Sequence, residues 1–180
     1  MNTNSQLSIS AIKSPKLSDK QRKEILDVCS RAYEEDFSPY LALLDNATHL
    51  IAYLGTELVS HAAWVPRELR LQGKCPLHTA YVEAVATLPE HQCKGYGSTV
   101  LAAIPPLIWE FDIAALSPSE APYYAKLGWV LWKGPLAYLH NAQEIETPDE
   151  EVMVYRLPKT PQELDINAKL VTDWRPGEIW

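Results

Sequence analysis

A strand, a glycine-containing loop and a helix follow one another directly between residues 79 and 104, and this unit constrains the fold more than any other stretch of the chain. Residues 79–87 (TAYVEAVAT) alternate in side-chain character, which is typical of a strand. The loop 91–97 (HQCKGYG) follows, and residues 97–104 are helix-like until two prolines end them. Alternation predicts that one face of the strand carries Tyr81, Glu83, Val85 and Thr87.

The other predicted elements are a mixture of helices and strands. A first helix begins at Ser18, where Gln21 completes a capping box, and runs towards Ala32. Two strands joined at Gly55 form a hairpin, and Pro66 marks a bulge or an edge in the second of them. The predicted strands and later elements are residues 49–54 and 57–71, a turn at Gln72-Gly73-Lys74, strands at 113–116, 129–132, 136–139 and 152–157, and a short helix at 120–127 ended by Gly128.

These elements predict an α+β fold with a mixed sheet, in one domain that covers residues 1–180. Residues 1–17 are flexible or supply a first strand, and residues 141–151 are polar, acidic and loop-like. The end of the chain, residues 158–180, finishes irregularly and carries two tryptophans. Because this is unusual for a free tail, we expect it to dock on the domain near the substrate site.

Charge and composition exclude several classes of partner. The chain has a net charge of −7 and no basic run, which argues against nucleic acid and suits a cationic small substrate. Its 3 cysteines lack metal-ligand spacing and its 5 histidines follow no pairing motif, so neither a disulfide framework nor a metal site is indicated. No apolar segment is long enough to cross a membrane, and we expect a cytoplasmic protein.

The loop 91–97 has two interpretations. It lacks the Gly-Lys-Ser/Thr of a Walker A loop and the three spaced glycines of a dinucleotide fingerprint, so it could be a plain turn. Alternatively, Gly95 and Gly97 let the backbone amides turn inward before the helix, which makes an anion site to which Lys94 adds little. Cys93 has no His–acid partner apparent in the sequence, so we expect no nucleophile there.

Two motifs, in the right order, resemble the GCN5-related N-acetyltransferases. Gln92-x-x-Gly95-x-Gly97 after VATLPE resembles the loop with which that family holds the pyrophosphate of acetyl-coenzyme A. ALSPSEAPYYAKLGW resembles its later strand–helix segment. The resemblance implies a splayed mixed β-sheet flanked by helices, acetyl-coenzyme A as the cofactor, and transfer of its acetyl group to an amine.

From about residue 18 onward the chain more narrowly resembles the aminoglycoside 2'-N-acetyltransferases, above all in its terminal DWRPGEIW. This implies acetylation of the 2'-amino group of an aminoglycoside, and antibiotic resistance. The chain departs from the pattern after Asp36-Phe37, where it reads Ser38-Pro39-Tyr40-Leu41, and is there similar to a branch that acetylates the smaller, less charged kasugamycin. Two alternatives stay open: the substrate could be another small amine or a peptide N-terminus, or the protein could be an acyl-coenzyme A-binding module without turnover. The family resemblance also implies a possible homodimer.

The resemblance also assigns roles to single residues. Glu83 would accept the proton of the amine through water, and Tyr124 would protonate the leaving thiolate. Each has a plainer alternative, because a strand carboxylate can make a structural hydrogen bond and a phenol can belong to the core. The residues expected to bind the cofactor are Val85, Ala86, Thr87, Gln92, Cys93, Lys94, Gly95, Tyr96, Gly97, Ser98 and Ser117. Those expected to bind the substrate are Asp36, Tyr81, Glu83, Ser117, Asp149, Glu178 and Trp180.

Overall fold

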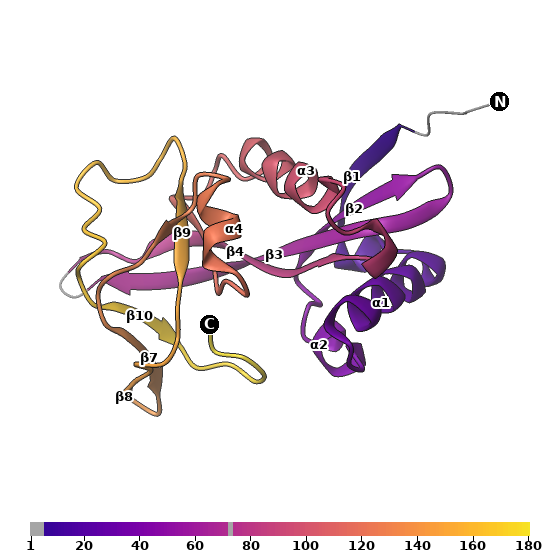
Figure 1. Cartoon of the computed structure of the whole chain (residues 1–180). Helices are drawn as coiled ribbons and strands as arrows, with labels where there is room; N and C mark the ends of the chain where they lie inside the picture. The colour runs from indigo at the N-terminus through magenta and orange to yellow at the C-terminus, as the bar shows by residue number, and fades with distance from the viewer. Residues whose placement is uncertain (1–5, 72–73) are drawn as a thin grey trace. The chain divides into compact units, whose positions relative to one another are not determined.

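Strands β3 (Glu57–Leu71) and β4 (Leu77–Thr87) are the two longest of the chain, and each contributes to both of its structural units (Figure 1). The computed structural model describes residues 6–71 and 74–180, so Gln72 and Gly73 of the predicted turn lie outside the described residues. The first unit holds the chain up to Val65 together with Val82–Ile104, and the second holds Pro66–Tyr81 together with Pro105–Trp180. The single domain expected for residues 1–180 stays a prediction.

The first unit is built on antiparallel strands. β1 pairs with β2, and β2 pairs with β3 from Leu54↔Glu57 to Thr48↔Trp64, which confirms the hairpin around Gly55. The register shift of this hairpin falls between Ala52 and Tyr53, and Pro66 lies beyond the last β2 partner. Besides β3 and β4, the elements are β1 (Leu7–Lys13), α1 (Asp19–Tyr33), α2 (Ser38–Ala42), β2 (Thr48–Leu54), α3 (Tyr96–Ala103) and the 3-10 turns Ser14–Lys16 and Pro89–His91.

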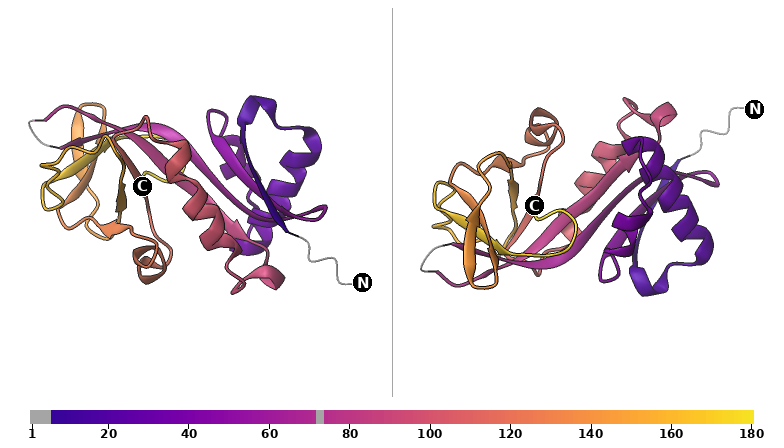
Figure 2. Two further views of the ribbon diagram at one scale, coloured as in Figure 1. Left: turned by 90° about the horizontal axis from the view of Figure 1, so that it is seen from above. Right: turned by 90° about the horizontal axis from the view of Figure 1, so that it is seen from below.

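Helices cover both faces of these strands. Figure 1 shows α1 and α2 on one side and α3 on the other, and in both views of Figure 2 the strands lie between α1 and α3. The predicted capping box is confirmed: the Ser18 hydroxyl accepts from the Gln21 amide at 3.2 Å, and the Gln21 side chain accepts from the Ser18 amide at 2.9 Å. α1 buries Ile25, Val28 and Cys29 against the core, and so fixes this face of the sheet.

The alternation predicted for residues 79–87 is broken at Ala84. This residue has a φ of +52°, a left-handed conformation that alanine rarely adopts, in the middle of β4. Glu83, Ala84 and Val85 are all half-buried, so burial does not alternate here. The common face predicted for Glu83, Val85 and Thr87 therefore does not follow from alternation alone, because a left-handed residue turns the strand between them.

The second unit contains two sets of paired strands. β4 pairs in parallel with β5 at Thr79↔Ile113, β5 pairs antiparallel with β9, and β9 with β6. The end of β3 pairs with β10, β10 pairs in parallel with β7, and β7 forms a hairpin with β8. The bounds are β5 (Ile113–Leu116), α4 (Ala121–Ala125), β6 (Val130–Leu131), β7 (Leu136–His140), β8 (Gln143–Glu146), β9 (Met153–Arg156), β10 (Leu170–Asp173) and the 3-10 turn Pro105–Leu107.

Two expectations for the second half of the chain were wrong in part. The loop predicted for residues 141–151 contains β8, which a two-residue turn joins to β7. Asn141 and Ala142 both have positive φ, the conformation that matches the twist of a tight hairpin. The tail predicted for residues 158–180 contributes β10 (Leu170–Asp173), a strand that was not predicted, and its last residues 174–180 are irregular as expected. Among the described residues, no helix is long and apolar enough to cross a membrane.

Candidate functional site

The loop between β4 and α3 has the geometry of an anion site. Cys93 and Gly95 have φ values of +59° and +84°, so the chain turns sharply before the helix. A Cβ built on Gly95 would meet nothing within 4 Å, and no side chain caps the helix at this residue. The amides of Tyr96 and Gly97 precede the first helical hydrogen bond, which runs from Thr99 to the Gly95 carbonyl at 2.9 Å. These observations fit the binding of a phosphate by backbone amides.

The loop is anchored on both sides by contacts within the first unit. Gln92 donates from its side chain to the Thr87 carbonyl at 3.2 Å, which ties the loop to the end of β4. Arg31 of α1 makes two hydrogen bonds to the Glu90 carboxylate, at 2.8 and 2.9 Å. His91 lies 3.2 Å from a carboxylate oxygen of Glu57. Arg31, Glu90 and His91 were not among the predicted site residues, because their pairing partners lie far away in the sequence.

The last four carbonyl groups of β4 each accept a hydrogen bond from a side chain. His61 donates to Ala84 at 2.8 Å, Tyr33 to Val85 at 3.0 Å, Ser60 to Ala86 at 3.0 Å and Gln92 to Thr87 at 3.2 Å. The first three donors were not predicted. They fix the backbone of the stretch that includes the predicted cofactor-binding residues 85–87 and directly follows the predicted base, Glu83.

Tyr124 in α4 is a buried phenol. Its exposed fraction is 5%, and its ring makes edge contacts with Tyr123 and Trp129. Burial raises the pKa of Tyr124, although a hydrogen bond with Ser119 opposes the change. The phenol therefore keeps its proton at neutral pH and can donate it. Ser117, which directly follows β5, is exposed.

The chain terminus is docked within the second unit. Trp180 is 3% exposed, and its indole nitrogen donates to the Thr147 hydroxyl at 2.9 Å. The Arg175 guanidinium donates to the Glu178 carbonyl at 2.6 Å. Trp174 remains 46% exposed and stacks on His140 with ring centroids 4.9 Å apart. The docking brings Trp180 to the segment that precedes Asp149, whose side chain is exposed.

Tyr81 lies among arginines rather than at an open surface. Its exposed fraction is 1%, and the guanidinium carbons of Arg67 and Arg175 lie 4.4 and 5.7 Å from its ring centroid. Arg67 also donates to the Thr172 hydroxyl at 2.7 Å. A substrate contact at Tyr81 stays a prediction, and it would need a face of the ring that these contacts leave accessible.

Asp36 is an exposed carboxylate with a local structural role. One of its oxygens accepts from the Ser38 amide at 3.0 Å and from the Ser38 hydroxyl at 2.6 Å, at the start of α2. These two hydrogen bonds lower the pKa of Asp36, so it is ionised at neutral pH. An ionised carboxylate here could also bind an ammonium group, and this role stays a prediction.

The predicted site residues thus form two groups, one in each unit. The first group contains Asp36, Glu83, Val85, Ala86, Thr87, Gln92, Cys93, Lys94, Gly95, Tyr96, Gly97 and Ser98. The second contains Tyr81, Ser117, Tyr124, Asp149, Glu178 and Trp180. Tyr81 and Glu83 belong to different groups but stand two residues apart on β4.

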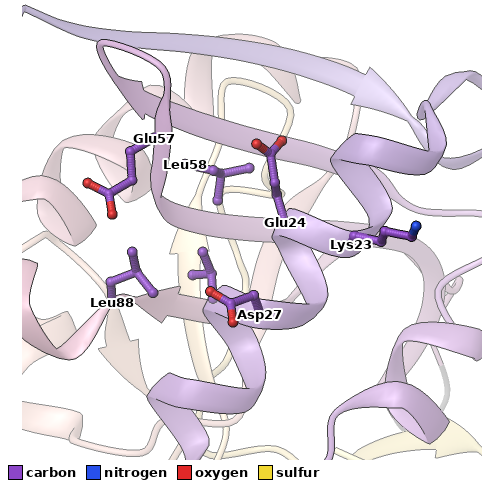
Figure 3. A pocket seen from close by; sticks show the side chains of 7 residues that line it. Lys23, Glu24, Asp27, Glu57, Leu58 and Leu88 are labelled. Carbon is purple, nitrogen blue, oxygen red and sulfur yellow. The ribbon is translucent and has the colours of Figure 1, made fainter.

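A pocket of about 260 Å³ in the first unit contains none of these residues. Figure 3 shows the side chains of Glu24, Asp27 and Glu57 around it, together with Leu58 and Leu88. Each carboxylate already has a partner: Glu24 accepts from the Tyr53 hydroxyl at 2.7 Å, and Asp27 and Glu57 lie near Arg31 and His91. The pocket is therefore explained by packing and surface ion pairs.

Comparisons with known proteins agree with the two motifs. The acetyltransferase (GNAT) domain family matches residues 14–131. An aminoglycoside 2'-N-acetyltransferase from Mycolicibacterium fortuitum is 32% identical over 157 residues, which is 83% of this chain and 80% of that protein.

Solved structures agree on the fold. A GNAT family N-acetyltransferase (YhbS) from Escherichia coli, in complex with CoA, has a TM-score of 0.65 at 14% identity, over 96% of this chain and 93% of that one. The chain spans only about a third of some larger relatives. Eis1 from Mycobacterium abscessus, for example, has a TM-score of 0.62 at 21% identity, over 73% of this chain and 33% of that one. These likenesses confirm the predicted α+β mixed-sheet fold.

Proposed function

The chain belongs to the GNAT acetyltransferases, and we propose that it acetylates the 2'-amino group of an aminoglycoside antibiotic and so confers resistance to it. Family membership makes the protein an acetyl-coenzyme A-dependent N-acetyltransferase. The observation that carries the substrate class is the 32% identity to the Mycolicibacterium fortuitum enzyme over most of both chains. The net charge of −7 supports a cationic substrate, although it does not select one.

Acetyl-coenzyme A, when bound, supplies the acetyl group as a thioester. We propose that backbone amides of the loop 92–98 hold its pyrophosphate, because the left-handed residues Cys93 and Gly95 precede the start of α3, where the first amides have no partner within the helix. Backbone groups of Val85 and Thr87 would align its pantetheine arm along β4, and Ala86 and Ser117 are the other predicted cofactor-binding residues outside the loop. Cys93 and Lys94 are exposed and would contribute mainly through their backbone.

Two side chains would move protons. The amine must lose a proton as its nitrogen forms a bond to the acetyl carbon, and Glu83 would take that proton through a water molecule. The bond from the acetyl carbon to sulfur breaks, and Tyr124 would give the departing sulfur its phenolic proton. The burial of Tyr124 supports this role, since it keeps the phenol protonated at neutral pH. Holding both reactants in place would supply much of the acceleration, up to roughly 7–11 kcal/mol in ideal cases.

The substrate would be held by carboxylates and by the docked terminus. Asp36, Asp149 and Glu178 would pair with ammonium and hydroxyl groups, and Trp180 would be one wall; Tyr81 and Ser117 complete the predicted set. The two hydrogen bonds from Ser38 to Asp36 support a site built for fewer positive charges, because they partly satisfy this carboxylate. We therefore propose kasugamycin as the first substrate to test.

Release of free thiol tests the proposal. The protein is mixed with acetyl-coenzyme A and a panel of amines that contains kasugamycin, more highly charged aminoglycosides with a 2'-amino group, a polyamine and a peptide N-terminus. We expect thiol release with at least one aminoglycoside and little with the other amines. Thiol release with only the polyamine or the peptide would show that the substrate is not an aminoglycoside but that amine. Cofactor binding without any release would indicate a binding module. The homodimer and the cytoplasmic location stay predictions.

A further inference from the structure

A chain of buried polar side chains crosses the first unit and ends on the left-handed residue of β4. The Ser14 hydroxyl lies 2.9 Å from Nε2 of His49, and Nδ1 of His49 lies 2.9 Å from Nε2 of His61. Nδ1 of His61 lies 2.8 Å from the Ala84 carbonyl oxygen. Ser14, His49 and His61 are 2%, 1% and 0% exposed. Hydrogen bonds thus link Ser14, which directly follows β1, to His49 on β2, His61 on β3 and Ala84 on β4.

The direction of these hydrogen bonds follows from the Ala84 end. A carbonyl oxygen only accepts, so Nδ1 of His61 carries a proton and donates it. In a neutral ring Nε2 of His61 then accepts, so Nδ1 of His49 must be the donor to it. Nε2 of His49 then faces the Ser14 hydroxyl as an acceptor, and the single proton of that hydroxyl is shared between Nε2 and the Leu44 and Ala47 carbonyls. The chain therefore requires both histidines to carry their proton on Nδ1.

The surroundings keep both rings neutral. Burial is the main cause that lowers the pKa of His61 to about 3, and the neighbouring His49 is a smaller one. The pKa of His49 is lowered to about 4, mainly by burial and less by the nearby Arg22 guanidinium. The Cys29 thiol of α1 lies 3.6 Å from Nδ1 of His61, and burial raises its pKa to about 12, so it carries no charge that would hold a proton on the ring. Each ring thus offers one fixed donor and one fixed acceptor.

The hydrogen bond to the Ala84 carbonyl fixes the orientation of the whole peptide group that joins Ala84 to Val85. Ala84 has a φ of +52°, which for a residue other than glycine costs roughly 1–2 kcal/mol, so the surroundings must hold it there. The peptide that joins Ala84 to Val85 is planar and trans, so its N–H points opposite to its C=O. A donor that fixes the Ala84 carbonyl therefore also fixes the direction of the Val85 amide. It fixes in addition the turn of the backbone that follows Glu83.

We propose that His61 is a positioning residue for acetyl transfer: through the Ala84 carbonyl it sets the left-handed turn of β4 and thereby aims the Val85 amide at bound acetyl-coenzyme A and Glu83 at the amine. His61 does not touch the reacting atoms, and His49 and Ser14 hold its ring in the donating orientation. The inference rests on the proposed role of β4 in holding the cofactor. It adds a residue that neither motif contains.

A matched pair of substitutions isolates the hydrogen bond. In His61→Asn the side-chain amide nitrogen occupies the position of Nδ1 and can donate to Ala84, whereas His61→Leu has the same branching and no donor. Both variants leave His49 without its His61 partner, and both are assayed at temperatures where they are folded, so that the rates compare the donor with its absence. We expect kcat/KM for acetyl-coenzyme A to fall at least about tenfold in the Leu variant and to stay within about threefold of wild type in the Asn variant.

Equal rates for the two variants, at temperatures where both are folded, would overturn the proposal. His78, an exposed histidine of the second unit, is the control, and both substitutions there should leave the rate unchanged. If the wild-type protein binds acetyl-coenzyme A but acetylates no aminoglycoside, the proposed substrate is wrong. The His61 pair is then compared by calorimetry, where weaker acetyl-coenzyme A binding by the Leu variant than by the Asn variant still supports the positioning role, and equal affinity refutes it.

Should either variant fail to fold, nitrogen NMR of the wild-type protein decides. The proposal requires the Nδ1–H form of the neutral His61 ring, together with an Nε2 resonance typical of an acceptor. The Nε2–H form would leave nothing to donate to Ala84 and would refute the proposal.

Discussion

The indole nitrogen of Trp180 donates a hydrogen bond to the Thr147 hydroxyl at 2.9 Å, and this contact holds the last residue of the chain against the turn that follows β8. A Trp180 side chain that is fixed in this way can serve as one wall of a binding site. If the proposed site is correct, the contact should matter for the amine substrate and not for the cofactor.

Thr147→Val removes the acceptor while keeping the branched shape of the side chain, so we expect KM for the aminoglycoside to rise about tenfold, equivalent to about 1.4 kcal/mol. The dissociation constant of acetyl-coenzyme A should not change. Thr147→Ser keeps the hydroxyl and is the control, and deletion of Trp180 should exceed the effect of Thr147→Val. Steady-state kinetics and calorimetry measure both quantities. An unchanged KM after deletion of Trp180 would remove the terminus from the site.

Tyr124→Phe should lower kcat by on the order of 10²-fold, the usual contribution of a general acid, because the phenolic proton is lost while the packing against Trp129 remains. The affinity for acetyl-coenzyme A should stay within about twofold. Tyr123→Phe removes the neighbouring hydroxyl and should leave kcat nearly unchanged. A full rate in Tyr124→Phe would mean that the leaving sulfur receives its proton from another donor, such as water.

Gly95→Val should weaken acetyl-coenzyme A binding about tenfold, because a β-branched residue does not tolerate a φ of +84° and the turn before α3 must change. Gly95→Asn, which tolerates this conformation, should bind nearly as well as wild type. Lys94→Ala and Cys93→Ala should change the affinity less than about threefold if backbone amides carry the site. Loss of binding in Lys94→Ala alone would favour a charge-based site instead.

The free energy of unfolding should fall as the pH drops from about 6.5 towards 4. His49 and His61 have folded-state pKa values of about 4 and about 3, below the value of 6.5 for an unfolded histidine. In this window the two histidines are protonated in the unfolded chain but stay neutral in the native protein. The free energy of unfolding therefore falls by up to about 1.4 kcal/mol per pH unit for each histidine. The full stability is present above pH 6.5 and no further loss from these groups occurs below pH 3.

Urea titrations at pH 7, 6 and 5 measure this slope, and the same titrations of His61→Asn provide the comparison. Carboxylates titrate mainly below this range, so the difference in slope between the two proteins isolates one histidine. Equal slopes for wild type and His61→Asn would show that His61 is not held neutral in the native state.

The elements with strong local signals could be predicted from the sequence. The capping box at Ser18, the hairpin around Gly55 and the strand 113–116 each depend on neighbouring residues or on a run of one residue type, and all three are present. β8 gave no such signal, because all four of its residues are exposed and it is held by pairing with β7 and by Lys169 contacts to Glu144 and Glu146. A strand without a buried face has no alternation to detect.

The site residues that could be predicted are mainly those that belong to sequence motifs. The loop around Gly95 stands out because a left-handed residue there calls for glycine, and its φ is +84°. The left-handed turn at Ala84 has no such residue to mark it, and His49 and His61 are 12 positions apart. Only the register of β2 and β3, in which Ile51 is opposite His61, brings the two rings together. Contacts that depend on strand register cannot be deduced from spacing along one chain.

The position of the acetyl group in the product tests whether this protein is an aminoglycoside 2'-N-acetyltransferase. Acetyl-coenzyme A and kasugamycin, or the best aminoglycoside of the panel, are incubated with the wild-type protein, and the product is mapped by proton and carbon NMR. We expect one new amide, at the 2'-amino group, formed in step with the release of free coenzyme A. An acetyl group on another amine of the drug, or no acetylated aminoglycoside while a polyamine or peptide is acetylated, would contradict it.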